Sequence, residues 1–312
     1  MKITNANKIY DNLPASQWRE FAYFSANLQH ILAIPFGKPH LKGYLELRDY
    51  IAKQAILDLR NGLSEGTTNE IFKGAINNGA SMFISFHYAS YRTLPLKILA
   101  EGKSVCVLLS EDVYDVYSDY YKALLATGES RGTSPKLHLQ RAEDPKIFFK
   151  LRQMVASGVH IFVYGDGTKG ALTSPAPQGN QQIKLLNALI SVRSGYLDFA
   201  YLLGTPAYLL LDRTKNPAQA TKSDSDLFCY KLQTQRNRQD FVKKMLTEIY
   251  VCFGHVLKDD PYCWESFLYL HRHTIPKSPL FDWQRQNRIV PFSWQQKRHV
   301  LDRYTYRVFE IE

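Results

Sequence analysis

Short runs of apolar residues recur along the middle of this chain, and they constrain its fold more than any other feature. Each run spans only a few residues, lies next to turn-forming residues, and is apolar on both of its faces. Such runs are typical of strands that a sheet buries on both sides. The runs are ASMFISF (80–86), SVCVLLS (104–110), VHIFVYGDG (159–167) and TPAYLLLDR (205–213).

Segments with helical spacing of apolar residues separate these runs, and one more short strand is expected at PKLHLQ. The segment 144–158 is predicted to be a helix with Asp144 as its cap and Pro145 in its first turn. The segment 183–204 is expected to be helical in part. The alternation predicts an α/β fold in which a central, largely buried, mostly parallel or mixed sheet is flanked by helices.

The chain of 312 residues is predicted to form a single domain. Its first part, residues 1–77, has helical spacing of apolar residues and is expected to be an N-terminal helical segment. The α/β core extends over residues 78–275. Residues 276–312 form a C-terminal extension that is expected to pack back onto the core.

The chain is basic, with a net charge of +10 and a pI near 9.3, which favours an acidic partner. Nucleic acid is not expected, because the sequence has neither a zinc-finger motif nor an aromatic strand of the RNA-binding type. Four cysteines without a C-x-x-C pair indicate a reduced, cytoplasmic protein. Cys263, His271 and His273 lack a second nearby cysteine, so no metal site is expected.

No stretch of about 18 consecutive apolar residues is present, and we therefore expect no membrane-spanning helix. The segment FAYFSANLQHILAIPFG (21–37) comes closest, but it carries Asn27, Gln29 and His30. A packed helix is the favoured interpretation of this segment. A peripheral contact with the inner membrane is left open beside the cytoplasmic location.

Two polar residues follow the predicted strands at positions suited to chemistry. His87 comes directly after ASMFISF, and Asp166 comes after HIFVY. In parallel sheets the reactive groups sit just past the carboxyl ends of strands. A histidine there is a candidate general base, although a lone strand-end histidine is more often structural. Asp166 is equally consistent with a turn former. Ser90 lies near His87, but this spacing is no evidence of a catalytic dyad.

The segment GDGTKG (165–170) matches the spacing G-x-G-x-x-G, but a dinucleotide site is not expected. Pro175 and Pro177 follow it and prevent the regular helix that such a site needs. No Lys-Ser or Lys-Thr pair follows Gly170, so the segment is not a P-loop either. We expect a flexible loop that can close over a ligand, and no cofactor.

Four segments, taken in order, resemble the lipid A biosynthesis acyltransferases of the glycerolipid acyltransferase superfamily. The first is a strand ending in histidine, and the second is a strand ending in an acidic turn. The third joins a helix to a strand through a glycine, and the fourth carries a Pro-x-x-Trp pattern before basic residues. The segments are FISFHYASYR, ASGVHIFVYGDG, VRSGYLDFAYLLGTPAYLLL (192–211) and DDPYCWESFLYLHR (259–272).

The resemblance implies a general base at His87, because the signature of that family is a histidine, four residues, then Asp or Glu. In this chain the acid position holds Arg92. A nearby cation lowers the pKa of a histidine and keeps it neutral, but it gives no support to the imidazolium that forms later. A carboxylate from elsewhere would have to supply that support. Asp166 is the first candidate, followed by Glu111 and Asp112.

The resemblance also implies an acyl thioester donor, on acyl carrier protein or CoA. The acceptor would be an amine or hydroxyl compound that is a small molecule, carrier-bound or lipid-like. A catalytically altered protein that binds a carrier protein or a lipid is the alternative interpretation. Arg92, Ser90, Gly167, Arg193 and Gly195 are the candidates for substrate binding. The oxyanion candidates are Arg131 and Arg141, with Arg193 also considered.

Overall fold

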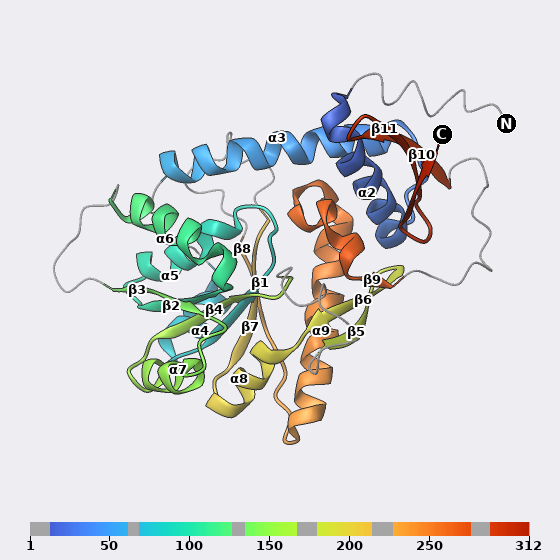
Figure 1. The fold of residues 1–312 in the computed structure, drawn as a ribbon. Helices are drawn as coiled ribbons and strands as arrows, with labels where there is room; N and C mark the ends of the chain where they lie inside the picture. Colours follow the sequence, from blue (N-terminus) through green and yellow to red (C-terminus); the bar gives the residue numbers. More distant parts are fainter. Residues whose placement is uncertain are drawn as a thin grey trace.

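The computed structural model describes residues 13–61, 69–126, 135–166, 180–213, 227–275 and 288–311. A six-stranded sheet forms its centre, in the order β3-β2-β4-β1-β7-β8 (Figure 1). The first five of these strands pair in parallel, and β8 is antiparallel to β7. The strands are β1 (Met82–Ser85), β2 (Val105–Leu109), β3 (Leu137–Arg141), β4 (His160–Tyr164), β7 (Ala207–Asp212) and β8 (Leu227–Lys231).

Side chains of the central strands alternate between two hydrophobic cores, one on each face of the sheet. In β1, Phe83 joins one core, while Met82 and Ile84 join the other. The first core is closed by α4 (Glu70–Asn77), α5 (Leu94–Ala100) and α6 (Glu111–Ala126). The second is closed by α7 (Ile147–Ala156), α8 (Gly195–Leu203) and α9 (Arg238–Asp259). The predicted α/β class, with a mostly parallel sheet flanked by helices, is therefore confirmed.

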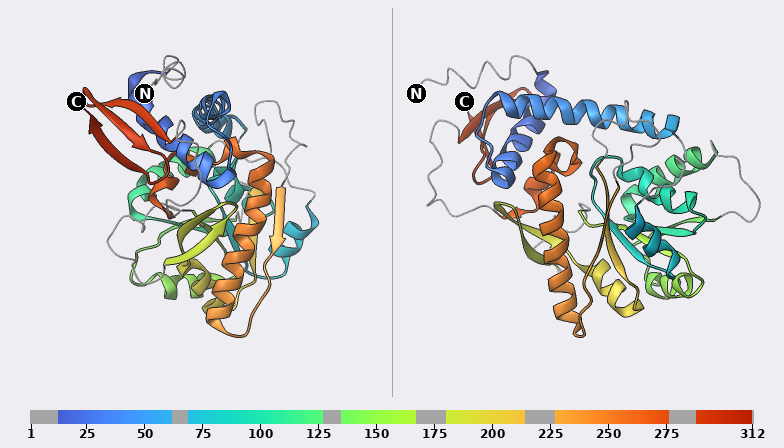
Figure 2. Two further views of the ribbon diagram at one scale, coloured as in Figure 1. Left: turned by 90° about the vertical axis from the view of Figure 1, so that its right-hand side faces the viewer. Right: turned by 180° about the vertical axis from the view of Figure 1, so that it is seen from behind.

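Two N-terminal helices and a C-terminal sheet pack together beside the central sheet (Figures 1 and 2). The helices are α2 (Ala15–Leu32) and α3 (Lys38–Asn61), and the sheet comprises β10 (Ile289–Trp294), β11 (Lys297–Asp302) and β12 (Arg307–Ile311). Buried polar contacts join them: His30 Nε2 lies 2.9 Å from the Arg303 carbonyl oxygen, and Arg303 donates to Ser25 Oγ at 3.0 Å.

The segment 183–204 is helical in part, as expected, but its first half forms strands. It forms β5 (Asn180–Leu185) and β6 (Ala188–Arg193), a hairpin extended by β9 (Thr274–Ile275), and only α8 is helical. The reason is the burial pattern of β6, in which every second side chain is buried. The helix predicted from Asp144 is also shorter, because the Asp144 carboxylate accepts the Lys146 N–H in a turn and α7 begins at Ile147.

Candidate functional site

His87 and Asp166 meet at the carboxyl ends of two neighbouring strands. His87 follows β1 and Asp166 follows β4, and these strands pair in parallel with Ser85 opposite Tyr164. His87 Nδ1 lies 2.7 Å from Asp166 Oδ1, and the His87 backbone N–H points at the same carboxylate at 3.1 Å. Residues 79 positions apart in sequence thus form a close pair.

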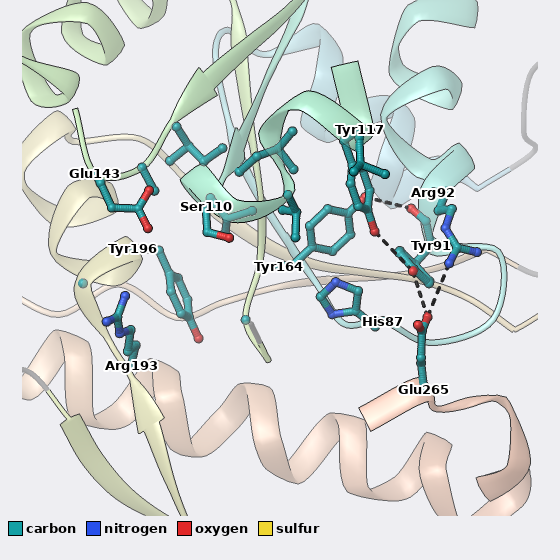
Figure 3. A pocket seen from close by; sticks show the side chains of 18 of the residues that line it. His87, Tyr91, Arg92, Ser110, Tyr117, Glu143, Tyr164, Arg193, Tyr196 and Glu265 are labelled. Atoms are coloured by element: carbon teal, nitrogen blue, oxygen red, sulfur yellow. Dashed lines mark hydrogen bonds and ion pairs between the residues drawn. The ribbon is translucent and has the colours of Figure 1, made fainter. Parts of the chain in front are cut away.

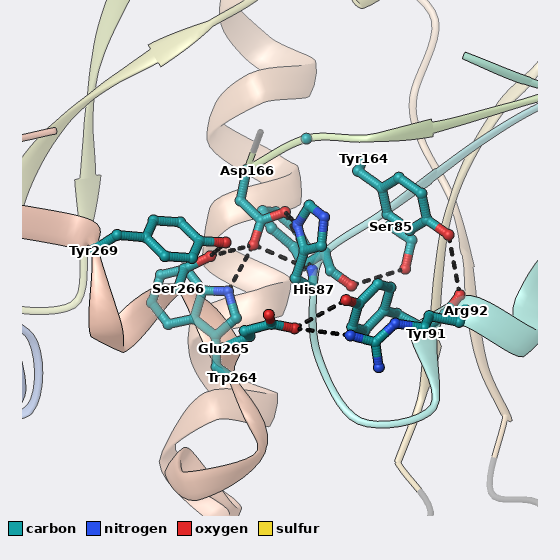
Figure 4. A network of polar contacts seen from close by, with 12 residues as sticks. Ser85, His87, Tyr91, Arg92, Tyr164, Asp166, Trp264, Glu265, Ser266 and Tyr269 are labelled. Atoms are coloured by element: carbon teal, nitrogen blue, oxygen red, sulfur yellow. Dashed lines mark hydrogen bonds and ion pairs between the residues drawn. The ribbon is translucent and has the colours of Figure 1, made fainter. Parts of the chain in front are cut away.

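The Asp166 carboxylate is held by further donors from a distant part of the chain (Figure 4). Trp264 Nε1 and Ser266 Oγ each donate to Oδ2 at 2.7 Å. Both residues belong to the irregular segment after α9, which contains short turns at Pro261–Cys263 and Glu265–Leu268. The carboxylate is buried, and these donors orient it toward the imidazole without competing for Oδ1.

The charges around His87 act in opposite directions on its pKa. Burial lowers the pKa, but opposing effects, led by the charge and hydrogen bond of Asp166, hold the pKa above its ordinary value. Glu265 also raises it, and Arg92 lowers it. Arg92, the cation at the acid position, therefore lowers the pKa of His87 as expected. Its effect is too small to decide the direction of the overall shift. The pKa of Asp166 is lowered, because His87, Ser266 and Trp264 overcome the penalty of its burial.

Arg92 pairs with a carboxylate of its own, Glu265. Arg92 Nη2 lies 3.5 Å from Glu265 Oε2, and the Tyr91 hydroxyl donates to the same oxygen at 2.8 Å. The guanidinium also lies over the Tyr91 ring, 4.5 Å from its centroid. The Glu265 backbone N–H donates to the His87 carbonyl oxygen at 3.0 Å, which fixes this second carboxylate beside the histidine.

A cavity of about 720 Å³ opens next to His87 (Figure 3). Its apolar walls come from β2, β4, α6 and α8, and include Leu108, Val113, Val163 and Phe199. Tyrosines surround the end at His87: the Tyr164 ring stacks on the imidazole at 4.9 Å, and the Tyr91 ring meets its edge at 4.8 Å. Tyr117 and Tyr269 also line the cavity. The cavity thus combines a candidate base with space for a largely apolar substrate.

Only some of the other candidate residues lie at the cavity. Arg92, Arg193 and Gly195 line the cavity together with His87. Ser90 is buried, and its hydroxyl accepts a hydrogen bond from Gln54 at 3.1 Å. Arg141 is exposed and forms ion pairs with Glu111 at 3.4 Å and Asp115 at 3.5 Å. Ser90, Arg141, Glu111 and Asp112 are not among the described residues that line the cavity, and Gly167 and Arg131 lie outside the described residues.

Several site residues were given no role from the sequence, although Trp264 was part of the Pro-x-x-Trp pattern. Trp264, Glu265 and Ser266 lie inside DDPYCWESFLYLHR, where the acidic residue and the hydroxyl directly after the tryptophan were the available signal. Tyr196 also lines the cavity, and its buried hydroxyl has no hydrogen-bond partner within the described chain. Burial, followed by the Asp166 charge, raises its pKa, so this phenol stays protonated.

Within the described ranges, no three His, Cys, Asp or Glu side chains come together in a group that could hold a metal ion. No helix in those ranges is long and apolar enough to cross a membrane. No protein-family model matches the chain, and no curated protein matches it either.

Proposed function

We propose that this protein is an acyltransferase that moves an acyl group from a thioester to an amine or hydroxyl acceptor, with His87 as the general base. The donor would be carried by an acyl carrier protein or by CoA. The observation that carries the proposal is the 2.7 Å contact between His87 Nδ1 and Asp166 Oδ1 at the edge of a large cavity. The resemblance to lipid A acyltransferases supports it, and with it an acyltransferase-like fold.

The geometry gives the two nitrogens of His87 different tasks. An ionised carboxylate can only accept hydrogen bonds, so the proton of the neutral imidazole lies on Nδ1. Nε2 then carries the lone pair, and no described residue is hydrogen-bonded to it. Asp166 would fix this tautomer and stabilise the imidazolium that forms when Nε2 takes a proton. In this role it replaces the acid that the resembled family keeps at the position of Arg92.

The proposed reaction has two steps, attack on the thioester and collapse of the intermediate. His87 Nε2 removes the proton of the acceptor as the acceptor attacks the carbonyl carbon of the thioester. A new bond to nitrogen or oxygen forms, and the carbonyl oxygen becomes an oxyanion. When this intermediate collapses, the carbon–sulfur bond breaks and the leaving thiolate takes the proton from His87. The apolar walls of the cavity suit an acyl chain, and the net charge of +10 suits an acidic carrier protein in the cytoplasm.

Turnover with charged carrier protein tests this function. The protein is incubated with acyl carrier protein bearing acyl groups of different lengths, and with a panel of amines and alcohols, and products are identified by mass spectrometry. We expect acylated acceptor, and a fall in kcat of roughly 10⁴-fold in His87→Ala, at least as large as for any residue that acts through His87. The control is His255→Ala, which alters an exposed histidine on α9.

Each other outcome contradicts a definite part of the proposal. Unchanged turnover in His87→Ala would show that His87 is not the general base. Release of free acid without acylated acceptor would identify a thioester hydrolase. Binding of the charged carrier without any turnover would favour the alternative, a non-catalytic protein that binds a carrier or a lipid.

A further inference from the structure

Glu265 places a negative charge in the wall of the cavity beside His87 (Figure 3). Its side chain is about one quarter exposed, compared with 5% for Asp166. The Tyr91 hydroxyl and Arg92 both contact Oε2, and no described residue is hydrogen-bonded to Oε1. One carboxylate oxygen therefore remains available to a ligand next to the base.

The charges around neutral His87 do not cancel. Asp166 and Glu265 contribute two negative charges, and Arg92 contributes one positive charge, so the cluster has a net charge of −1. The tyrosines do not change this balance, since burial raises the pKa values of Tyr91 and Tyr164 well above the ordinary value and keeps both phenols neutral. This end of the cavity therefore attracts a cation.

Aromatic faces add to the attraction. Tyr91, Tyr117, Tyr164 and Tyr269 line this end of the cavity, and a tyrosine ring attracts a cation placed over its face. Arg92 already makes such a contact with Tyr91. An alcohol acceptor could donate one hydrogen bond to the carboxylate, whereas an ammonium group would add a full positive charge and more donors, and would also be attracted by the rings.

We propose that the acceptor is a primary amine, which binds as an ammonium ion to Glu265 and is acylated on nitrogen. This inference rests on the proposed acyl transfer and chooses between its two acceptor classes. The bound ammonium transfers one proton to His87 Nε2, and the neutral amine attacks the thioester carbonyl to form a carbon–nitrogen bond. The carbon–sulfur bond breaks, the thiolate takes the proton from His87, and the second nitrogen proton passes to solvent.

The test uses a matched pair of acceptors, hexylamine and hexan-1-ol, with the same charged carrier protein. We expect kcat/KM for the amine to exceed that for the alcohol by at least about 100-fold, because only the ammonium pairs its own positive charge with the carboxylate of Glu265. In Glu265→Gln, KM for hexylamine should rise by about 10-fold or more, while kcat changes less. Hexylammonium binding, measured by calorimetry without any donor, should weaken to the same extent.

Glu248→Gln is the matched control. Glu248 on α9 also accepts a tyrosine hydroxyl, from Tyr230 at 2.7 Å, and it does not line the cavity. This variant should leave KM and hexylammonium affinity unchanged.

Acylation of the alcohol with equal or higher kcat/KM would overturn the assignment of an amine acceptor, while the proposed acyltransferase activity would still hold. Equal hexylammonium affinity in wild type and Glu265→Gln would also overturn it. If neither acceptor is acylated with any charged carrier protein, the proposed acyltransferase function itself would be contradicted.

Discussion

Asp166 and Glu265 are both carboxylates beside His87, but they differ in what surrounds them. Asp166 is buried, contacts the ring nitrogen directly, and accepts hydrogen bonds from Trp264 and Ser266 (Figure 4). Glu265 is partly exposed, reaches His87 only through its own backbone N–H, and faces a cation at 3.5 Å. The Asp166 carboxylate is thus fixed by hydrogen bonds to both oxygens. Among the described residues, only Oε2 of Glu265 is contacted.

Under the proposed acyl transfer, this difference assigns the two carboxylates to different parts of the reaction. A carboxylate fixed against the imidazole controls which nitrogen carries the proton, so its loss should reduce kcat. A carboxylate in the cavity wall can contact a ligand, so its loss should chiefly raise KM. Arg92, at the position where the resembled family has its acid, belongs to the second carboxylate and not to the first.

The largest effect is expected from Asp166→Asn. The substitution keeps the size of the side chain but removes the charge, and the new amide can present an N–H to His87 Nδ1, which favours the wrong tautomer. We expect kcat to fall by roughly 10³–10⁴-fold. The measurement is steady-state transfer to the preferred acceptor, with a thermal melt to show that the variant is folded. A fall in kcat no larger than that in Glu265→Gln would abolish the distinction between the two carboxylates.

A smaller effect is expected on the titration of His87 itself. In the wild type the imidazole should titrate above its ordinary pKa, because Asp166 and Glu265 together raise the pKa more than burial and Arg92 lower it. Glu265→Gln removes a charge that raises this pKa, so the midpoint should move to lower pH. Arg92→Met removes a charge that lowers it, so the midpoint should move to higher pH.

Nuclear magnetic resonance of protein labelled at the histidine ring nitrogens measures these midpoints, with His87→Ala to assign the signal. His160 provides an internal reference, since burial lowers its pKa to about 4 and its Nδ1 accepts the Ser81 backbone N–H. A shift in the same direction in both variants would show that Arg92 and Glu265 do not act on His87 by charge.

The positions of His87 and Asp166 could be anticipated from sequence, because both follow short buried strands and parallel strands end at one edge of a sheet. Their contact could not be deduced, since it depends on β1 and β4 being neighbours in the sheet order. The expectation that 183–204 is helical in part was confirmed by α8, but the β5–β6 hairpin in the same segment was not anticipated. Short apolar segments with frequent Leu and Ile satisfy helical and strand spacing almost equally well.

The position of Glu265 could not be deduced from the sequence for a different reason. It lies in a segment of short turns, Pro261–Leu268, where no periodicity indicates which side chains face inward. Its place is set by backbone hydrogen bonds to a segment more than 170 residues away, including Ala89 N–H to the Cys263 carbonyl oxygen at 3.0 Å. Arg92 was conspicuous from sequence, but its partner depended on this long-range pairing.

The smallest effect is expected on the free energy of unfolding, to which the Arg92–Glu265 ion pair should contribute little. A double-mutant cycle with Arg92→Met and Glu265→Gln isolates its coupling, because the methionine keeps much of the aliphatic stem and the glutamine can still accept the Tyr91 hydroxyl. We expect a coupling of about 1 kcal/mol or less, since the pair is long and partly exposed. The measurement is the free energy of unfolding from denaturant titration of the wild type and the three variants.

The same cycle on the other pair completes the comparison. His87→Gln with Asp166→Asn should give a coupling of roughly 1.5–3 kcal/mol, because the contact is short, buried and made to a charged acceptor. A coupling above about 3 kcal/mol for Arg92–Glu265 would mark that pair as a buried structural ion pair. Arg92 would then neutralise most of the charge of Glu265, and an ammonium ion at Oε1 would bind more weakly. A weak coupling leaves negative charge on Glu265 that can attract an ammonium ion to Oε1, as the proposed amine binding requires.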